Sequence, residues 1–335
     1  MRMSHLDIYA VGQALVDEEY SVDEAFLATL GVAKAHRTLI DFERSRTLRK
    51  AASNEGTLLK RMNGGSGANS LTASAQLGAK CHFSCRLGDD ADGDFYIQQL
   101  TDSGVTTDPH DRVKDGHTGV CLIMVTPDAE RTMNTYIGIT DDIGIDNVNF
   151  DALAAADWLF LEGHLSISSL GHQAALACRN QARKLGKKIA VNFCDPAVVR
   201  LCREEMTELL SDRCDLLFCN EEEARIWSHK PDLEDALSSL DDLADTWVMT
   251  RGDQGAIAFD GHTRFEIPAH KVKAINTTGA GDTFAGAFMY GLSQGHSYQT
   301  AGALASLASA VKVQHSGARL DQAQLLDCRK RILGH

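Results

Sequence analysis

The sequence has few prolines and no long apolar run. Only 5 of its 335 residues are proline, which argues against long disordered linkers, because such linkers are rich in proline and small polar residues. The first apolar segment, residues 8–11, is too short for a signal peptide or a membrane span. We therefore expect a globular, cytoplasmic protein that does not use a membrane as its partner.

Paired cysteine motifs and an excess of positive charge are also missing. The 9 cysteines are scattered, and the pairs Cys81/Cys85 and Cys214/Cys219 lie in apolar runs, so we expect buried thiols rather than a zinc site. The formal net charge of -13 opposes nonspecific attraction to nucleic acid or to an anionic membrane. A small molecule is the expected partner.

Two common nucleotide-binding signatures are absent as well. The chain contains no G-x-x-x-x-G-K-[ST] motif, and the dinucleotide fingerprint would need a third glycine where Phe284 stands. A nicotinamide-dependent oxidoreductase is therefore disfavoured. Only the alternation of strand and helix patterns suggests that alternative.

Short apolar runs alternate with helical patterns along much of the chain. Residues 171–185 have the spacing of an amphipathic helix that ends before Gly186. The predicted strands are residues 7–12, 158–161, 188–193, 216–219 and 247–250. Such alternation predicts an α/β fold, a three-layer α/β/α core with a mostly parallel sheet and ligands at the carboxyl ends of its strands.

Two segments interrupt this alternation, residues 18–61 and residues 116–136, the second with a β-rich run at 120–125. We expect them to form a small β-rich lid beside the core. The core would then consist of residues 1–17, 62–115 and 137–335.

A glycine-rich turn before an apolar helical pattern is the most informative segment, and it reads NTTGAGDTFAG over residues 276–286. Gly279 and Gly281 allow the backbone to approach a ligand closely, and the N–H groups at a helix start favour a phosphoryl group. Asp282 could cap this helix. Alternatively, it could accept a proton from a substrate hydroxyl while the neighbouring amides stabilise the phosphoryl group.

This string resembles the second signature of the ribokinase-like (PfkB) family of carbohydrate and nucleoside kinases. The first signature is matched by GGSGAN at 64–69, with LGA at 77–79 and RLGDDADG at 86–93. Further similarities are Val16-Asp17, NEEEA at 220–224 and TRGDQGA at 250–256. The resemblance covers nearly the whole chain. It implies an ATP-dependent kinase that phosphorylates a primary hydroxymethyl group.

The resemblance also implies roles for the matching residues. Asp282 would be the general base, and a backbone anion hole would be formed by Gly279, Ala280 and Gly281. The substrate would be held by Asp17, Gly64, Gly65, Asn69 and Gln13. A carboxylate and an amide can together accept from and donate to a pair of sugar hydroxyls. Gln13 stands where many nucleoside kinases of the family have Asn.

ATP and Mg²⁺ are the cofactors that the resemblance implies. Asn220 and Glu223 would shape the magnesium and phosphate region, Glu223 through water, because magnesium keeps part of its hydration shell. Taken alone, this run would be a solvated helix start. The other cofactor-binding residues would be Thr250, Arg251, Gly252, Gly255 and Gly317, which otherwise belong to a surface turn and a helix end. Asn276 replaces the usual Asp, which argues against a monovalent-cation site.

Several features favour the adenosine-kinase branch of the family. The segment between Asp17 and Gly64 is long, and residues 118–121 and 129–133 resemble lid elements in which Arg131 would lie near the transferred phosphate. However, residues 134–138 lack the small-residue run of adenosine kinases. A ribokinase- or fructokinase-like sugar kinase and a non-catalytic nucleoside- or sugar-binding module remain alternatives. The protein would be a monomer or a lid-mediated homodimer without a nucleic-acid partner.

Overall fold

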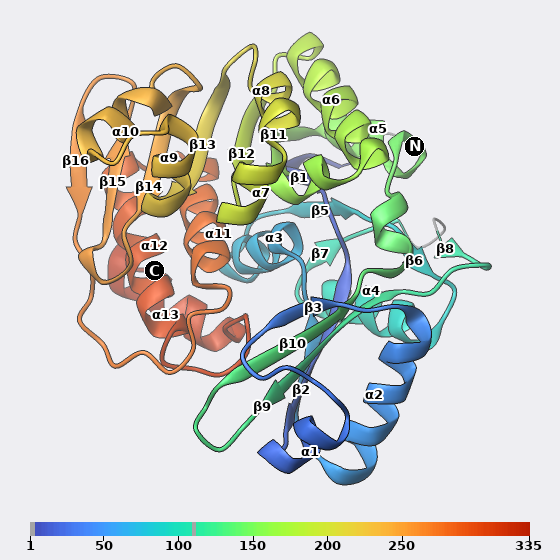
Figure 1. Ribbon diagram of the computed structural model, residues 1–335. Coiled ribbons are helices and arrows are strands. Elements are labelled where there is room, and N and C mark those ends of the chain that lie inside the picture. Colours follow the sequence, from blue (N-terminus) through green and yellow to red (C-terminus); the bar gives the residue numbers. More distant parts are fainter. Residues whose placement is uncertain (1–3, 109–111) are drawn as a thin grey trace.

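The computed structural model describes residues 4–108 and 112–335, so residues 1–3 and 109–111 of the predicted core lie outside it. A nine-stranded sheet forms the centre, in the order β16-β15-β14-β13-β12-β11-β1-β5-β7 (Figure 1). All neighbours from β14 to β7 are parallel, whereas β15 and β16 are antiparallel additions. The prediction of a mostly parallel sheet is thus confirmed. The strands are β1 (Leu6–Val11), β5 (Cys81–Ser84), β7 (Val105–Thr106), β11 (Ala156–Glu162), β12 (Lys188–Asn192), β13 (Cys214–Asn220), β14 (Ala244–Thr250), β15 (Ala256–Phe259) and β16 (Arg264–Ile267).

Both faces of this sheet are buried. Successive apolar side chains of a strand point alternately towards one helix layer and towards the other. In β1, Ile8 and Ala10 belong to one core cluster, and Tyr9 and Val11 belong to the other. The first cluster includes residues of α3 (Ser66–Leu77), α4 (Ala91–Asp102), α11 (Ala280–Ser293), α12 (Tyr298–Lys312) and α13 (Gln322–Leu333). The second includes residues of α5 (Phe150–Ala155), α6 (Ser169–Lys184), α7 (Pro196–Leu201), α8 (Arg203–Leu209), α9 (Glu221–Ser228) and α10 (Leu233–Leu240). The predicted three-layer core and the predicted helix at 171–185 are confirmed.

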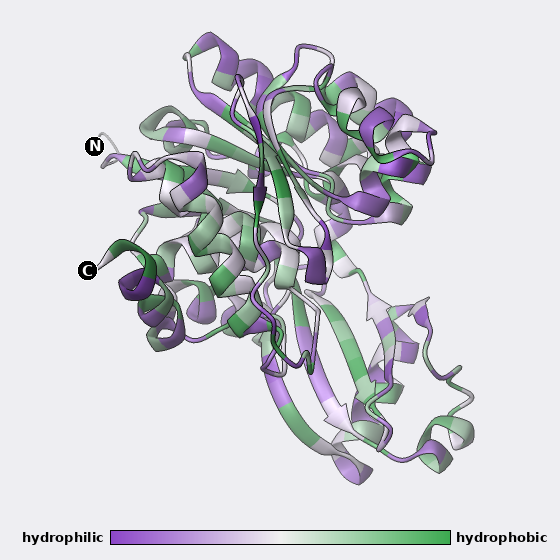
Figure 2. Ribbon diagram, turned by 90° about the vertical axis from the view of Figure 1, so that its left-hand side faces the viewer, coloured by the Kyte–Doolittle hydropathy of each residue, from purple (hydrophilic) through white to green (hydrophobic). Residues whose placement is uncertain are grey.

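A second sheet extends away from this layered core (Figure 2). Its strands, in the order β3-β10-β9-β2-β4, are β3 (Arg37–Leu39), β10 (Arg131–Tyr136), β9 (Gly119–Val125), β2 (Leu15–Ser21) and β4 (Thr57–Asn63). The helices α1 (Glu24–Thr29) and α2 (Phe42–Glu55) pack on one of its faces, where Phe26, Leu48 and Leu122 share a small core. The remaining elements are β6 (Leu87–Gly88), β8 (Arg112–Val113), and four 3₁₀ turns at Gly138–Asp142, Ile145–Asn147, Gly163–Ile167 and Gly252–Gln254.

Strand alternation gives the second sheet two different faces. In β2, Glu18 points towards α2, where its carboxylate lies 2.7 Å from the guanidinium of Arg49. Its neighbours Asp17 and Glu19 point the opposite way and line a cavity together with Asn276 and Gly317 of the layered core. The helix-free face of the second sheet therefore borders the glycine-rich turn. Within the two described segments, no helix combines the length and the apolar character needed to cross a bilayer.

Candidate active site

Close packing of α3 against α11 brings the two glycine-rich signatures together. A Cβ atom on Gly286 of α11 would lie 2.2 Å from the carbonyl oxygen of Ser70 in α3, so only glycine permits this approach. The hydroxyl of Ser74 also donates to the carbonyl of Gly286 at 2.7 Å. The side chains of the first turn of α3 consequently reach the first turn of α11.

Asp282 is held at this meeting point by two side chains of α3. Its Oδ1 accepts from the hydroxyl of Ser66 at 2.6 Å, and its Oδ2 accepts from the amide Nδ2 of Asn69 at 2.8 Å. The N-cap of α11 is Gly279, so Asp282 does not cap its helix. Burial raises the pKa of Asp282 above its usual value, while the bonds from Ser66 and Asn69 lower it. The carboxylate is fixed in position and is more basic than a solvated one.

The glycine turn leaves backbone amides free beside Asp282. Gly279 has a φ of +74°, and a Cβ there would lie 2.1 Å from the carbonyl oxygen of Ala318, so this position requires glycine. The amide of Ala280 donates to the carbonyl of Thr277 at 3.1 Å. In the described part of the chain, the amides of Gly279 and Gly281 have no such partner, and the space beside Gly281 is open. Two of the three predicted amides can therefore receive a ligand in this conformation.

The predicted substrate residues gather next to Asp282. A Cβ on Gly64 would lie 2.5 Å from Oδ1 of Asp17, and Gly65, with a φ of +94°, packs on the carbonyl of Gln13. Burial raises the pKa of Asp17 to about 7; Arg319 lowers it, and the charge of Asp282 contributes to raising it. The chain thus brings Gln13, Asp17, Gly64, Gly65 and Asn69 close to one another, and their role in holding the substrate stays a prediction.

Glu162, which no sequence motif indicates, supports this site by binding two backbone amides. It is the last residue of β11, is 0% exposed, and its Oε1 accepts from the amide of Gln13 at 2.6 Å. Its Oε2 accepts from the amide of Gly67. Burial raises the pKa of Glu162 to about 7. The carboxylate therefore ties the loop after β1 to the first turn of α3.

We expect the stability contribution of Glu162 to depend on pH. Because its folded-state pKa of about 7 exceeds the ordinary value of 4.5, the folded protein binds the proton more tightly than the unfolded chain. Stability is therefore lost as pH rises from about 5 to about 7. Relative to Glu162→Gln, the free energy of unfolding of the wild type should fall by at most about 1.4 kcal/mol per pH unit in that window.

Denaturant unfolding of both proteins at several pH values measures this difference. Glu55→Gln, at the exposed end of α2, is the matched control. A difference between the wild type and Glu162→Gln that stays constant from about pH 5 to about pH 7 would contradict the raised pKa.

Arg319 is a second residue that the sequence did not reveal. Its Nε donates to Oδ1 of Asn69 at 2.6 Å, which leaves the amide nitrogen of Asn69 facing Asp282. Its Nη2 is buried and has no hydrogen-bond partner within the described residues. The charges of Asp17 and Asp282 both act on the guanidinium. Arg319 therefore orients Asn69 and keeps one donor available near the two carboxylates.

The second sheet contributes two cations to the same cavity. Arg131 at the start of β10 and Lys60 of β4 line it together with Asp17, Thr278 and Gly317. Nη2 of Arg131 lies 3.0 Å from Oε1 of Glu19. A Cβ on Gly317 would lie 2.8 Å from Nζ of Lys60. Positive charge from the second sheet therefore faces the glycine turn.

Asn220 and Glu223 form a reciprocal capping box at the start of α9. Oδ1 of Asn220 accepts from the amide of Glu223, Oε2 of Glu223 accepts from the amide of Asn220, and both bonds are 2.8 Å long. Glu223 is only 2% exposed, so the interpretation of a solvated helix start is wrong for this residue. Burial raises the pKa of Glu223 to about 7, and the nearby charges of Asp195 and Asp282 contribute. An acidic group with one oxygen to spare suits contact with hydrated magnesium.

The turn after β14 is held by contacts with the end of β13 and the start of α9. The hydroxyl of Thr250 donates to the carbonyl of Cys219 at 3.4 Å, and Nε of Arg251 donates to Oε2 of Glu221 at 2.9 Å. Gly252 and Gly255 have φ values of +59° and +87°. A nucleotide would therefore have to share the guanidinium of Arg251 with Glu221.

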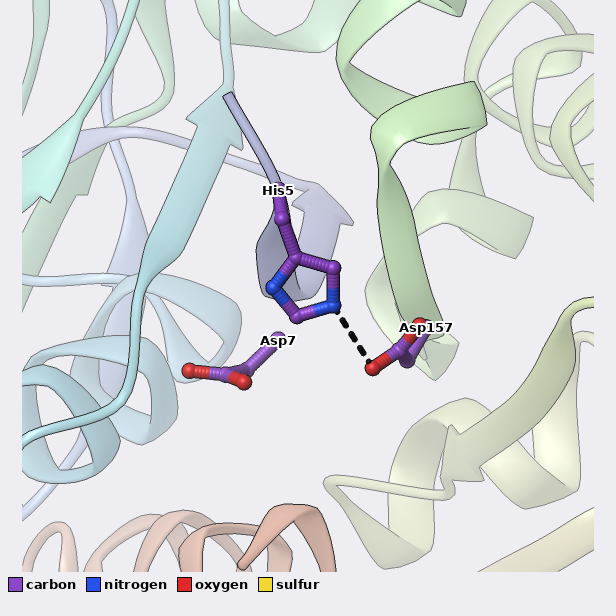
Figure 3. A group of neighbouring side chains, drawn as sticks. All are labelled: His5, Asp7 and Asp157. Carbon is purple, nitrogen blue, oxygen red and sulfur yellow. Dashed lines mark hydrogen bonds and ion pairs between the residues drawn. The ribbon is translucent and has the colours of Figure 1, made fainter. Parts of the chain in front are cut away.

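One further group of acidic and imidazole side chains lies elsewhere (Figure 3). Nε2 of His5 is 2.9 Å from Oδ2 of Asp157, and Oδ2 of Asp7 accepts from the amide of Lys80. These residues lie at the amino ends of β1 and β11, whereas Gln13 and Glu162 lie at the carboxyl ends. The group is an exposed ion pair at the opposite edge of the sheet from Asp282.

The chain belongs to the pfkB family of carbohydrate kinases, because the model of that family matches residues 29–324. It is therefore a sugar or nucleoside kinase. The ribokinase of Haemophilus influenzae is 28% identical over 265 residues, which is 76% of this chain and 82% of that protein.

Two solved structures are similar over almost their full lengths. A probable sugar kinase from Rhizobium etli CFN 42 has a TM-score of 0.87 and 30% identity, covering 98% of this chain and 99% of that one. The adenosine kinase from Sinorhizobium meliloti has a TM-score of 0.87 and 27% identity with the same coverage. The relatives therefore include both sugar and nucleoside kinases.

Proposed function

We propose that this kinase transfers the γ-phosphoryl group of ATP to a primary hydroxymethyl group, with Asp282 as the general base. The observation that carries the proposal is the placement of Asp282, which Ser66 and Asn69 hold beside the free amides of Gly279 and Gly281. Transfer of a phosphoryl group to a hydroxyl requires a base that accepts the proton and, next to it, an anion site for the phosphoryl group.

In the proposed reaction, Asp282 accepts the proton of the attacking hydroxyl as the bond from oxygen to the γ-phosphorus forms. The bond between the γ-phosphorus and the bridging oxygen breaks, and ADP leaves. Amides of Gly279 and Gly281 donate to the phosphoryl oxygens. Asn220 and Glu223 would hold hydrated magnesium, which would neutralise phosphate charge. Positioning and electrostatics account for most of the catalysis.

The acceptor is a nucleoside of the adenosine type or a sugar, held by Asp17 and Asn69. The adenosine kinase of Sinorhizobium meliloti supports the first class, and the ribokinase of Haemophilus influenzae supports the second. Asp17 can accept from hydroxyls, and the free Nη2 of Arg319 can donate to an acceptor oxygen. Both classes present a primary hydroxymethyl group next to further hydroxyls.

The second sheet, predicted as residues 18–61 and 116–136, acts as a lid over the acceptor in this proposal. Its face with Asp17 and Glu19 already borders the glycine turn. Closure would exclude water from the γ-phosphate and bring Arg131 to the transferred group. Small-angle scattering that detects no compaction with acceptor and an ATP analogue would count against closure.

We expect Asp17→Asn to weaken acceptor binding more than it slows turnover. A hydrogen bond to a charged group is worth about 1.5–3 kcal/mol, so KM for the acceptor should rise by about 10- to 150-fold. Asp102→Asn, at the exposed end of α4, is the control. Steady-state kinetics at saturating ATP measures the effect, and an unchanged KM would remove Asp17 from the acceptor site.

The proposed function is tested by ADP release in the presence of Mg²⁺ with adenosine, other nucleosides, ribose and fructose. Asp282→Asn serves as the blank. We expect release that depends on the acceptor. Binding of adenosine or a sugar in calorimetry without any ADP release would instead support a non-catalytic binding module.

A further inference from the structure

A charged side chain is fully buried beneath the glycine turn. Lys312, the last residue of α12, is 0% exposed. Its Nζ donates to the carbonyl oxygen of Asn276 at 2.9 Å. Over residues 4–108 and 112–335, no carboxylate lies within ion-pair distance of it. Burying an ammonium without a counter-charge is costly, so its retention requires an explanation.

The neighbouring backbone carbonyls are already satisfied by the protein. The amides of Ile275 and Asn276 donate to the carbonyl of Val313 at 2.7 and 3.0 Å. Nδ2 of Asn276 donates to the carbonyl of Gly317 at 3.2 Å. Clusters of carbonyl oxygens can replace the hydration shell of an alkali cation. Here these carbonyls bind N–H groups and the ammonium of Lys312 instead.

Asn276 also has the wrong charge for a metal site. Its side chain is neutral, and Oδ1 already accepts from the amide of Thr278 at 2.9 Å. Nδ2 is engaged with Gly317. The residue therefore offers neither a free oxygen nor a negative charge to a monovalent cation. The residues present at this position do not fit such an ion.

We propose that the ammonium of Lys312 is a built-in cation beneath the glycine turn, in place of a bound monovalent metal ion. It fixes the carbonyl that directly precedes the turn and supplies positive charge below the phosphoryl site. Accordingly, the kinase needs neither K⁺ nor Na⁺. The kinetic part of this inference rests on the proposed function, whereas the ion-binding part does not.

The charges around Lys312 are compatible with this role. Burial lowers the pKa of Lys312 to about 8, and Arg131 and Lys60 lower it further, whereas Glu19 and Asp282 act in the opposite direction. At pH 7 the ammonium form therefore predominates. Assays at that pH examine the charged state.

The wild type is compared with KCl, NaCl or tetramethylammonium chloride at equal ionic strength. Both the ADP-release rate and the thermal midpoint should be insensitive to the choice of monovalent cation, with rates within about twofold, because no monovalent metal ion takes part. A rate that is tenfold higher in K⁺, or a midpoint that rises specifically with K⁺ or Na⁺, would overturn the proposal. The thermal midpoint decides the ion-binding part even if no acceptor is phosphorylated.

Lys312→Met removes the ammonium while it keeps most of the side-chain volume. We expect about 10- to 100-fold slower ADP release, less than the roughly 10²–10³-fold loss for a donor in direct contact with the transition state, because the ammonium acts through the carbonyl of Asn276. Lys330→Met, exposed in the last turn of α13, is the control. Unchanged ADP release by Lys312→Met would contradict the role. Should this variant fail to fold, the wild-type titrations decide.

A double variant tests whether the position can be converted into a metal site. Asn276→Asp combined with Lys312→Ala supplies a carboxylate and vacates the space of the ammonium. We expect its thermal midpoint to rise with K⁺ concentration and not with tetramethylammonium. If the folded double variant shows no response to K⁺ or Na⁺, the ammonium does not stand in for a metal ion.

Discussion

Replacing Asp282 with Asn is expected to lower kcat by about 10²–10⁴-fold, the usual contribution of a general base. The amide keeps the size of the carboxylate but cannot accept the hydroxyl proton at neutral pH. ATP affinity should change little, because the amides of Gly279 and Gly281 remain in place. Steady-state kinetics and calorimetry with ATP measure the two quantities separately.

The matched control for this variant is Asp102→Asn, at the exposed end of α4. It removes an equal charge from the surface and should leave kcat unchanged. Turnover by Asp282→Asn close to that of the wild type would show that a group other than Asp282 accepts the hydroxyl proton. Equal losses of ATP affinity and kcat would instead indicate a damaged phosphate site.

Replacing Arg131 with Met is expected to slow turnover by about 10²–10³-fold, the cost of removing one donor to the transition-state charge. Its guanidinium lines the cavity beside Thr278 and Gly317. The variant also leaves Glu19 without its partner at 3.0 Å. Single-turnover rates at saturating ATP and acceptor measure the effect on the transfer step.

A second variant separates the two consequences of this change. Arg131→Met combined with Glu19→Gln removes the stranded carboxylate, so a loss that comes only from Glu19 should disappear in the double variant. Arg46→Met, on the exposed side of α2 near Glu43, is the surface control. Full activity of the double variant would assign Arg131 a purely structural role.

Features that depend on a local sequence pattern, such as strands and a helix start, could be predicted from the sequence. Strands such as β11 and β12 were predicted because apolar runs between helical patterns require a buried parallel sheet. The position of Asp282 after two glycines was predicted because a helix start with small residues is a local feature. The resemblance then placed Asn69 in the same site, and its amide does reach Asp282.

The sequence did not reveal residues whose importance arises from distant contacts. Glu162 is an isolated carboxylate in an apolar strand, and only the fold brings the amides of Gln13 and Gly67 to it. Arg319 and Lys312 are likewise isolated cations until α12 and the chain after it pack beside the glycine turn. The rule that ligands gather at the carboxyl ends of strands could have identified Glu162 alone.

Two local details also escaped prediction, for physical reasons. The amide of Ala280 donates to the carbonyl of Thr277, three residues earlier in the chain. This bond removes one of the expected donors. Glu223 is buried because it lies one helical turn before the buried Trp227, on the same face of α9. That helical spacing was visible in the sequence, and it could have distinguished Glu223 from its exposed neighbour Glu222.

The most direct test of the account is phosphorus NMR of the product formed by the wild type from ATP, Mg²⁺ and each acceptor in turn. Adenosine is compared with 5′-deoxyadenosine, and ribose with 5-deoxyribose. We predict a phosphate monoester on the primary carbon of the accepted nucleoside or sugar, and no product from its deoxy analogue. Phosphate on a secondary hydroxyl, or inorganic phosphate alone, would contradict the account.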